Sequence, residues 1–130
     1  MPEIIIVKNE AEAGEIYGRC VADLIKAKPD AVLGLATGSS PLAAYQALAK
    51  IVKDEAIDVS GVRGFALDEY IGLPADAPQR FGTFLSRAIF DRKPFRKVHL
   101  MNSGAGDGRQ ECHRYSELLR YCLLYTSDAA

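Results

Sequence analysis

The sequence predicts an α/β fold with an open, mostly parallel sheet and helices on both faces. Two observations predict it. Short apolar runs of strand length alternate with longer segments whose apolar residues recur at helical spacing. Two of these runs also stop abruptly at polar residues, one at Thr37 and one at Asp68. In open parallel sheets, ligands bind at the carboxyl ends of strands, so these two stops mark the expected functional edge.

The expected elements can be placed in chain order. We expect strands at residues 4–7, 32–36, 62–67 and 98–101, because each run is short and mainly apolar, and the first of them is also β-branched throughout. We expect helices at 10–27 after an Asn9 cap, at 41–53, from Phe81 onward and at 109–121. The stripe expected on the first helix consists of Ile16, Tyr17, Cys20, Val21, Leu24 and Ile25. The order β-α-β-α-β-loop-α-β-α is Rossmann-like, and it contains no internal repeat.

Composition narrows the classes of function. The 130 residues are 48% hydrophobic, enough for one domain with one core. The 16 basic and 17 acidic residues nearly balance, and no basic stripe appears, so nucleic acid and anionic membrane are poor partners. The N-terminal apolar run is too short for a signal peptide or membrane span, so we expect a cytoplasmic protein. We interpret Cys20, Cys112 and Cys122 as reduced packing residues.

The loop Thr37, Gly38, Ser39, Ser40 lies between the second predicted strand and the helix that follows it. Pro41 suits a first helical position and Ser40 suits an N-cap. Free amide N–H groups and the positive end of the helix dipole then meet at a strand end, which favours an anion, commonly phosphate. On this loop alone, a capped strand-to-helix turn without a ligand is an equally good interpretation.

Asp68 and Glu69 follow the third predicted strand. Because neighbouring residues at a strand end point to opposite sides, only one of the two carboxylates can face a cleft above the 37–40 loop. A carboxylate there could act as a general base on a carbon acid beside a carbonyl. Carboxylates after strands are also common in ordinary loops, so spacing alone does not assign this role.

Two segments together resemble a known family. Leu-Ala-Thr-Gly-Ser-Ser-Pro-Leu-Ala-Ala-Tyr-Gln-Ala-Leu at 35–48 and Phe-Ala-Leu-Asp-Glu-Tyr-Ile-Gly-Leu-Pro at 65–74 resemble the two N-terminal signatures of the glucosamine-6-phosphate deaminase family, and their spacing also fits. The related 6-phosphogluconolactonases usually carry Asp-Glu-Arg where this chain has Asp68-Glu69-Tyr70. The deaminase branch is therefore the closer match.

The resemblance implies roles for individual residues. Thr37, Gly38, Ser39 and Ser40 would hold the sugar phosphate, with Glu69 in the substrate-binding set, and Asp68 would be the catalytic acid/base that moves a proton between C1 and C2 of the opened sugar. Glu69 and Tyr70 would mainly support the loop. Glucosamine 6-phosphate and water would give fructose 6-phosphate and ammonia, without a metal or organic cofactor. The partner is a small sugar phosphate, and the parent protein is expected to be a homo-oligomer.

The chain also departs from the family pattern. Arg80 stands where the family often has serine. Asp107-Gly108 is expected to be a turn and helix start, His113 a helix-surface residue and His99 a packed strand residue. Residues 1–121 resemble the N-terminal part of the family domain, so we expect a truncated fold, and 122–130 are expected to be a tail foreign to it. The segment with the ring-opening histidine is not reached, so we expect little activity from the chain alone. Two alternatives stay open, a 6-phosphogluconolactonase-like hydrolase and a non-catalytic sugar-phosphate sensor.

Overall fold

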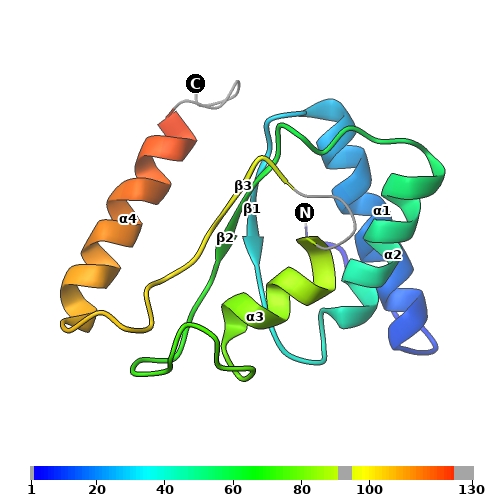
Figure 1. Cartoon of the computed structure of the whole chain (residues 1–130). Helices are drawn as coiled ribbons and strands as arrows, with labels where there is room; N and C mark the ends of the chain where they lie inside the picture. Colours follow the sequence, from blue (N-terminus) through cyan, green and yellow to red (C-terminus); the bar gives the residue numbers. More distant parts are fainter. Residues whose placement is uncertain (1, 91–94, 125–130) are drawn as a thin grey trace.

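The computed structural model describes residues 2–90 and 95–124, and its centre is a parallel sheet (Figure 1). The strands are β1 (Val32–Leu35), β2 (Arg63–Ala66) and β3 (Lys97–His99), in the order β1-β2-β3. The register pairs Leu35 with Ala66 and Phe65 with His99. Three of the predicted strands and their parallel arrangement are thereby confirmed.

Helices cover both faces of the sheet, as predicted. On one face lie α1 (Glu10–Ala27), α2 (Leu42–Asp54) and α3 (Phe81–Leu85), the last continuing into the π-helical turn η1 (Ser86–Phe90). On the other face lies α4 (Gly108–Leu124), the one helix there among the described residues (Figure 1). The predicted start of α4 at Asp107-Gly108 is confirmed, because the Asp107 carboxylate accepts hydrogen bonds from the backbone N–H groups of Arg109 and Gln110.

The strand expected at residues 4–7 is wrong. These residues form no strand, and the side chains of Ile4 and Ile6 are 89% and 93% exposed. A β-branched run favours extended backbone, but a strand also needs a neighbour that satisfies its N–H and C=O groups. Among the described residues no strand pairs with this run, so its propensity is not enough.

Helix α1 packs on α2 through small residues, and of the broad stripe that was expected Val21 and Ile25 pack in the core. Its Asn9 cap is confirmed, since the Asn9 side chain accepts from the N–H of Glu12 at 2.9 Å. The buried residues are Gly14, Gly18, Ala22 and Ile25, whereas Tyr17 and Leu24 are 53% and 45% exposed. A Cβ built on Gly14 would lie 2.6 Å from the carbonyl carbon of Ala43. The glycines therefore set the close approach of the helices, which hydropathy spacing does not show.

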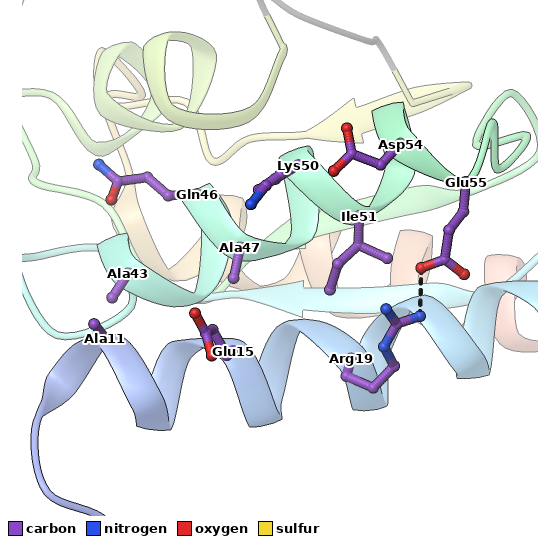
Figure 2. Close-up of a pocket in the computed structure, with 10 residues that line it drawn as sticks. All are labelled: Ala11, Glu15, Arg19, Ala43, Gln46, Ala47, Lys50, Ile51, Asp54 and Glu55. Atoms are coloured by element: carbon purple, nitrogen blue, oxygen red, sulfur yellow. Dashed lines mark ion pairs between the residues drawn. The ribbon is translucent and has the colours of Figure 1, made fainter.

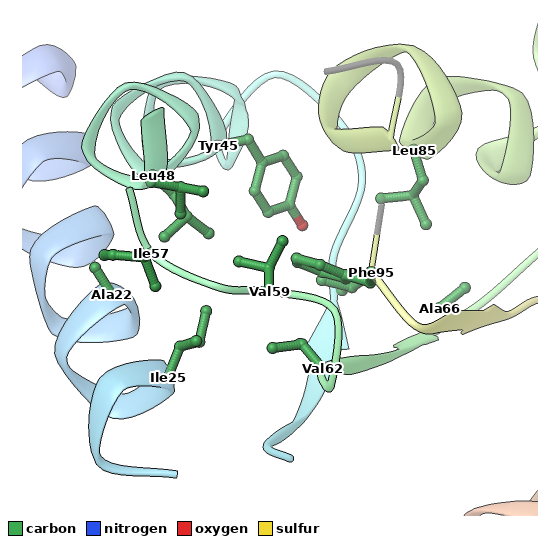
Figure 3. Packing of buried hydrophobic residues seen from close by; sticks show 12 residues of the cluster. Ala22, Ile25, Tyr45, Leu48, Ile57, Val59, Val62, Ala66, Leu85 and Phe95 are labelled. Carbon is green, nitrogen blue, oxygen red and sulfur yellow. The ribbon is translucent and has the colours of Figure 1, made fainter. Parts of the chain in front are cut away.

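The core is divided between the two faces of the sheet. The larger cluster lies under α1, α2 and α3 and includes Ile25, Leu48, Val62 and Leu85 (Figure 3). The smaller cluster lies under α4 and contains Phe65, Tyr115 and Cys122. Phe65 and Ala66 belong to different clusters because successive strand residues point to opposite faces. Burial of these apolar groups is the main stabilising contribution to the fold.

The packing interpretation of the cysteines holds for one of the three. Cys122 is buried, but Cys20 and Cys112 are exposed because α1 and α4 turn them away from the sheet. Of the tail expected at 122–130, α4 includes Cys122 to Leu124, and the remaining residues 125–130 lie outside those described. Within residues 2–90 and 95–124, none of the helices has the length and apolar character to cross a membrane.

Candidate functional site

The two loops singled out in the sequence follow neighbouring strands and leave the sheet at the same edge. The Leu35–Ala66 pair closes the register of β1 and β2, and the N–H of Leu67 donates to the carbonyl of Leu35 at 3.2 Å. Extending this register by two residues sets Thr37 level with Asp68. The parallel pairing therefore brings the polar loop and the carboxylate to one edge (Figure 1).

The loop 37–40 presents unsatisfied donors at the start of α2. Gly38 has φ +101°, a conformation that residues with a Cβ rarely adopt, and Ser39 and Ser40 are exposed while Thr37 is half-buried. Helix α2 begins at Leu42, Pro41 stands at its N-cap position, and no side chain caps it. The expected Ser40 cap is therefore wrong, because Pro41 already has helical backbone angles and leaves Ser40 one residue too early. The amide N–H of Leu42 donates to the carbonyl oxygen of Ser39 at 3.2 Å, whereas the N–H groups of Ala43 and Ala44 have no backbone partner among the described residues and remain available to a ligand.

A tyrosine of α2 fixes the carbonyl group of Ala36, the residue before this loop. The hydroxyl of Tyr45, on α2, donates a hydrogen bond to the carbonyl oxygen of Ala36. Burial raises the pKa of Tyr45 to about 12, with a further contribution from Tyr17, so the hydroxyl stays protonated near neutral pH. Sequence periodicity shows Tyr45 only as a core residue, and the polar end of its side chain is what the structure adds.

Asp68 has an exposed side chain. Within the described part of the chain, its carboxylate takes part in no hydrogen bond or ion pair. A free carboxylate at the carboxyl end of a strand can accept a proton from a ligand seated on the neighbouring loop.

Glu69 lies in entirely different surroundings from its neighbour. Its side chain is only 3% exposed, and its oxygens accept from the backbone N–H groups of Tyr70, Phe81 and Gly82 at 3.0, 2.9 and 3.0 Å. Two of these donors belong to the first turn of α3, so Glu69 satisfies a helix start that is distant in sequence. The expectation that only one of the two carboxylates faces the open edge is confirmed, and Asp68 is the exposed one.

Arg80 joins three segments around this edge. Its guanidinium donates to the carbonyl oxygens of Ala75 at 3.0 Å and Met101 at 3.4 Å, and its Nε lies 3.5 Å from Oε2 of Glu69. This Nε is buried and lacks a hydrogen-bond partner among the described residues. The sequence flagged Arg80 only as a departure from the family, and its contacts explain it as a tie between Glu69, the 75–80 loop and the end of β3.

The two histidines lie where they were predicted, His99 packed on a strand and His113 on a helix surface. His99 lies on β3 with its ring stacked on that of Phe65, 4.4 Å between centroids, and its Nε2 is 3.9 Å from Sγ of Cys122. His113 is exposed on α4. The part of the chain that the structure describes contains no group of three or more His, Cys, Asp or Glu side chains placed to hold a metal ion.

Two hollows lined by described residues lie away from the 37–40 loop and Asp68. One is an open groove of about 540 Å³ between α1 and α2, where Glu15 and Arg19 face Lys50 and Glu55 (Figure 2). Arg19 and Lys26 both pair with Glu55, and these two contacts, Lys26 first, lower the pKa of its carboxyl. The other is a pocket of about 240 Å³ under α4. Neither includes Asp68 or the 37–40 loop.

Comparison with known proteins agrees with the motifs. A family model described as glucosamine-6-phosphate isomerases/6-phosphogluconolactonase matches residues 9–128. The chain is 84% identical over 91 residues to a glucosamine-6-phosphate deaminase of Bifidobacterium longum, covering 70% of this chain and 34% of that protein. It is 41% identical over 123 residues to glucosamine-6-phosphate deaminase 1 of Giardia intestinalis, covering 92% of this chain and 46% of that one.

A solved structure has the same fold as this chain. A monomeric glucosamine-6-phosphate deaminase superposes with a TM-score of 0.86 at 31% identity, covering 92% of this chain and 51% of that one. The chain thus spans between about a third and about half of the length of these relatives. It belongs to the glucosamine-6-phosphate isomerase/6-phosphogluconolactonase family.

Proposed function

We propose that this chain supplies the phosphate loop and the catalytic base of a glucosamine-6-phosphate deaminase. The reaction converts glucosamine 6-phosphate and water to fructose 6-phosphate and ammonia. One observation carries the proposal: the register of β1 and β2 sets the 37–40 loop level with the free carboxylate of Asp68, in a chain that is 84% identical over 91 residues to a protein named as this deaminase.

In this proposal the sugar phosphate binds where α2 begins. Its donors are the free amide N–H groups of Ala43 and Ala44 and the hydroxyls of the loop residues Thr37, Ser39 and Ser40. Gly38 permits the positive φ that turns the loop, and open space around it lets a phosphate approach the backbone. The tie between Tyr45 and Ala36 fixes where the loop starts.

Asp68 acts on the reacting carbons of the opened sugar. Its carboxylate takes the proton from C2, which is acidified by the neighbouring aldehyde and amine, and the resulting enolamine receives a proton at C1. The imine now at C2 adds water and releases ammonia, which leaves the ketone of fructose 6-phosphate. No metal or organic cofactor enters this sequence. Both carboxylate oxygens of Glu69 accept hydrogen bonds from the start of α3. Glu69 therefore supports substrate binding by holding the loop that carries Asp68.

A homo-oligomeric parent and a cytoplasmic location remain predictions from the resemblance and the sequence. The solved deaminase that superposes on this chain is described as monomeric, so membership of the family does not decide the oligomeric state.

A chimera tests the proposed function directly. The chain replaces the matching segment of the Bifidobacterium longum deaminase, and release of ammonia and of fructose 6-phosphate is measured from glucosamine 6-phosphate. We expect turnover, a loss of at least about 10²-fold with Asp68→Asn, and near-normal turnover with Asp76→Asn, an exposed aspartate in the next loop. An active Asp68→Asn chimera would remove Asp68 from the mechanism.

The same chimera separates the remaining alternatives. Acid release from a 6-phosphogluconolactone without ammonia release would replace the deaminase by a lactonase. Binding of glucosamine 6-phosphate without any turnover, in a chimera with normal folding, would replace the enzyme by a sensor. The 130-residue chain is assayed alongside, and we expect it to bind sugar phosphate while releasing little ammonia.

A further inference from the structure

A pocket whose lining includes three cationic residues lies under α4, away from the proposed catalytic edge. The pocket of about 240 Å³ is lined by Arg63, Arg96, Lys97 and His99 from the sheet side and by Leu118, Tyr121 and Cys122 from α4. Arg63 and Lys97 are the first residues of β2 and β3, so the cations gather at the amino ends of the strands. The 37–40 loop and Asp68 lie at the opposite, carboxyl ends.

The register of the sheet places two of these cations directly opposite each other. Arg63 pairs with Lys97, and two residues further along Phe65 pairs with His99. Side chains two apart on a strand share a face, and Phe65 belongs to the cluster under α4. The side chains of both pairs therefore lie on the face that α4 covers. Like charges opposite one another on neighbouring strands destabilise a sheet. Arg63 and Lys97 therefore repel each other beside the pocket that they line.

No acidic side chain lines the pocket to neutralise it. The two acidic residues of the covering helix, Glu111 and Glu117, are paired with Arg114 and Arg120 of the same helix. Within the described residues, Arg63, Arg96 and Lys97 form no ion pair with a carboxylate. The pKa of His99 is lowered, mainly by burial. The positive charges of Lys97, Arg63 and Arg114 lower it further.

We infer that this pocket binds the phosphate group of a small phosphorylated molecule. Three cations suit a dianion, and guanidinium groups match phosphate oxygens through paired N–H donors. The side chains of Leu118 and Tyr121 offer apolar surface to the rest of the ligand. A volume of about 240 Å³ suits a small molecule, and a nucleic acid would need a basic surface that continues beyond the pocket.

The two histidines of the chain make an internal test. In proton NMR titrations at matched ionic strength, replacing chloride by phosphate neutralises the cations beside His99, so its pKa rises by about half a unit or more. His113, exposed on α4, serves as the reference and is unchanged. If neither histidine responds, or if both shift equally, the proposal fails. Phenyl phosphate is the second probe, and it binds more tightly than inorganic phosphate if the apolar wall contributes.

Variants separate this pocket from the proposed catalytic loop. Lys97→Gln relieves the repulsion with Arg63, so the variant melts at or above the wild-type temperature in chloride, and phosphate stabilises it less than the wild type because only the 37–40 loop still binds the anion. Lys53→Gln, an exposed lysine at the end of α2, makes the same charge change and keeps the wild-type stabilisation by phosphate. If phosphate stabilises Lys97→Gln as much as the wild type, the anion binds elsewhere and the proposal is wrong. The amide of Gly38 reports binding at the 37–40 loop separately.

Discussion

The hydroxyl of Tyr115 lies 2.7 Å from the carbonyl oxygen of Ala66, the last residue of β2. The same hydroxyl is 2.9 Å from the carbonyl oxygen of His99, the last residue of β3, so one phenol from α4 joins the carboxyl ends of two strands. On the opposite face, Tyr45 holds Ala36 just beyond β1 in the same way. The strands that carry the candidate site therefore end at carbonyls fixed by tyrosines from two different helices.

Tyr115→Phe should loosen the segment that leads to Asp68. Burial raises the pKa of Tyr115 to about 12, so the native hydroxyl is a donor at neutral pH, and its removal leaves buried carbonyls with one partner fewer. We expect the free energy of unfolding to fall by about 1–3 kcal/mol in urea denaturation. Amide exchange should rise at Leu67 and Asp68. Tyr17→Phe, at a 53% exposed tyrosine, is the control and should change neither quantity.

Tyr45→Phe should act on the other loop. The cost to folding is again about 1 kcal/mol or more, because the Ala36 carbonyl loses its donor. The faster amide exchange should now appear at Gly38 and Ser39 and leave Asp68 unchanged. If both variants accelerate exchange at both loops, the tyrosines support the sheet as a whole and not the individual strand ends.

Much of this architecture follows from local sequence rules. Helix α1 has its Asn9 cap, β1 and β2 are apolar runs, and polar loops follow them, so each could be placed within a residue or two. The 37–40 loop and Asp68 could be brought together because parallel strands share an edge for their carboxyl ends. The local sequence pattern and the parallel pairing of consecutive strands are enough to place the loop beside Asp68.

Other features depend on contacts between distant segments, which periodicity does not encode. The run at 4–7 has the composition of a strand but lacks a neighbour among the described residues. Glu69 looks like a loop carboxylate until the first turn of α3 folds over it. Ser40 was expected to cap α2, but Pro41 already adopts helical angles. In each case a tertiary or backbone detail overrides a correct local preference.

Glu69→Gln should destabilise the loop that carries Asp68. The amide keeps one acceptor oxygen but turns an NH₂ group toward backbone N–H donors, and it leaves the buried Nε of Arg80 without a carboxylate. We expect a loss of about 1–3 kcal/mol in unfolding free energy. Glu15→Gln, at an exposed glutamate of α1, is the matched control. Equal stability of the two variants would show that the buried carboxylate contributes little to the fold.

Gly14→Ala should push α1 away from α2. The new Cβ would meet backbone atoms of Ala43 at 2.6–2.8 Å, and backbone cannot move aside as a flexible side chain can. The steric cost of about 1–3 kcal/mol should exceed the gain of up to about 1 kcal/mol in helix propensity. Gly106→Ala, where a Cβ would meet nothing within 4 Å, should be neutral by comparison. A Gly14→Ala protein that melts at or above the wild-type temperature would contradict the close helix approach.

Glu111→Gln should change how stability depends on acid. The carboxylate accepts from Arg114 and from the backbone N–H of Asn102, and these contacts lower the pKa of Glu111 from 4.5 to about 2. The unfolded chain therefore binds more protons than the folded chain between these values. The stabilisation is complete above about pH 4.5 and is lost as the pH falls towards about 2. In urea unfolding at a series of pH values, the free energy of unfolding of Glu111→Gln should fall less steeply across this window than that of the wild type. The control is Glu117→Gln, whose ion pair is more exposed, and it should keep the wild-type slope. If Glu111→Gln keeps the full slope, other carboxylates dominate the acid transition and the contact with Asn102 contributes little.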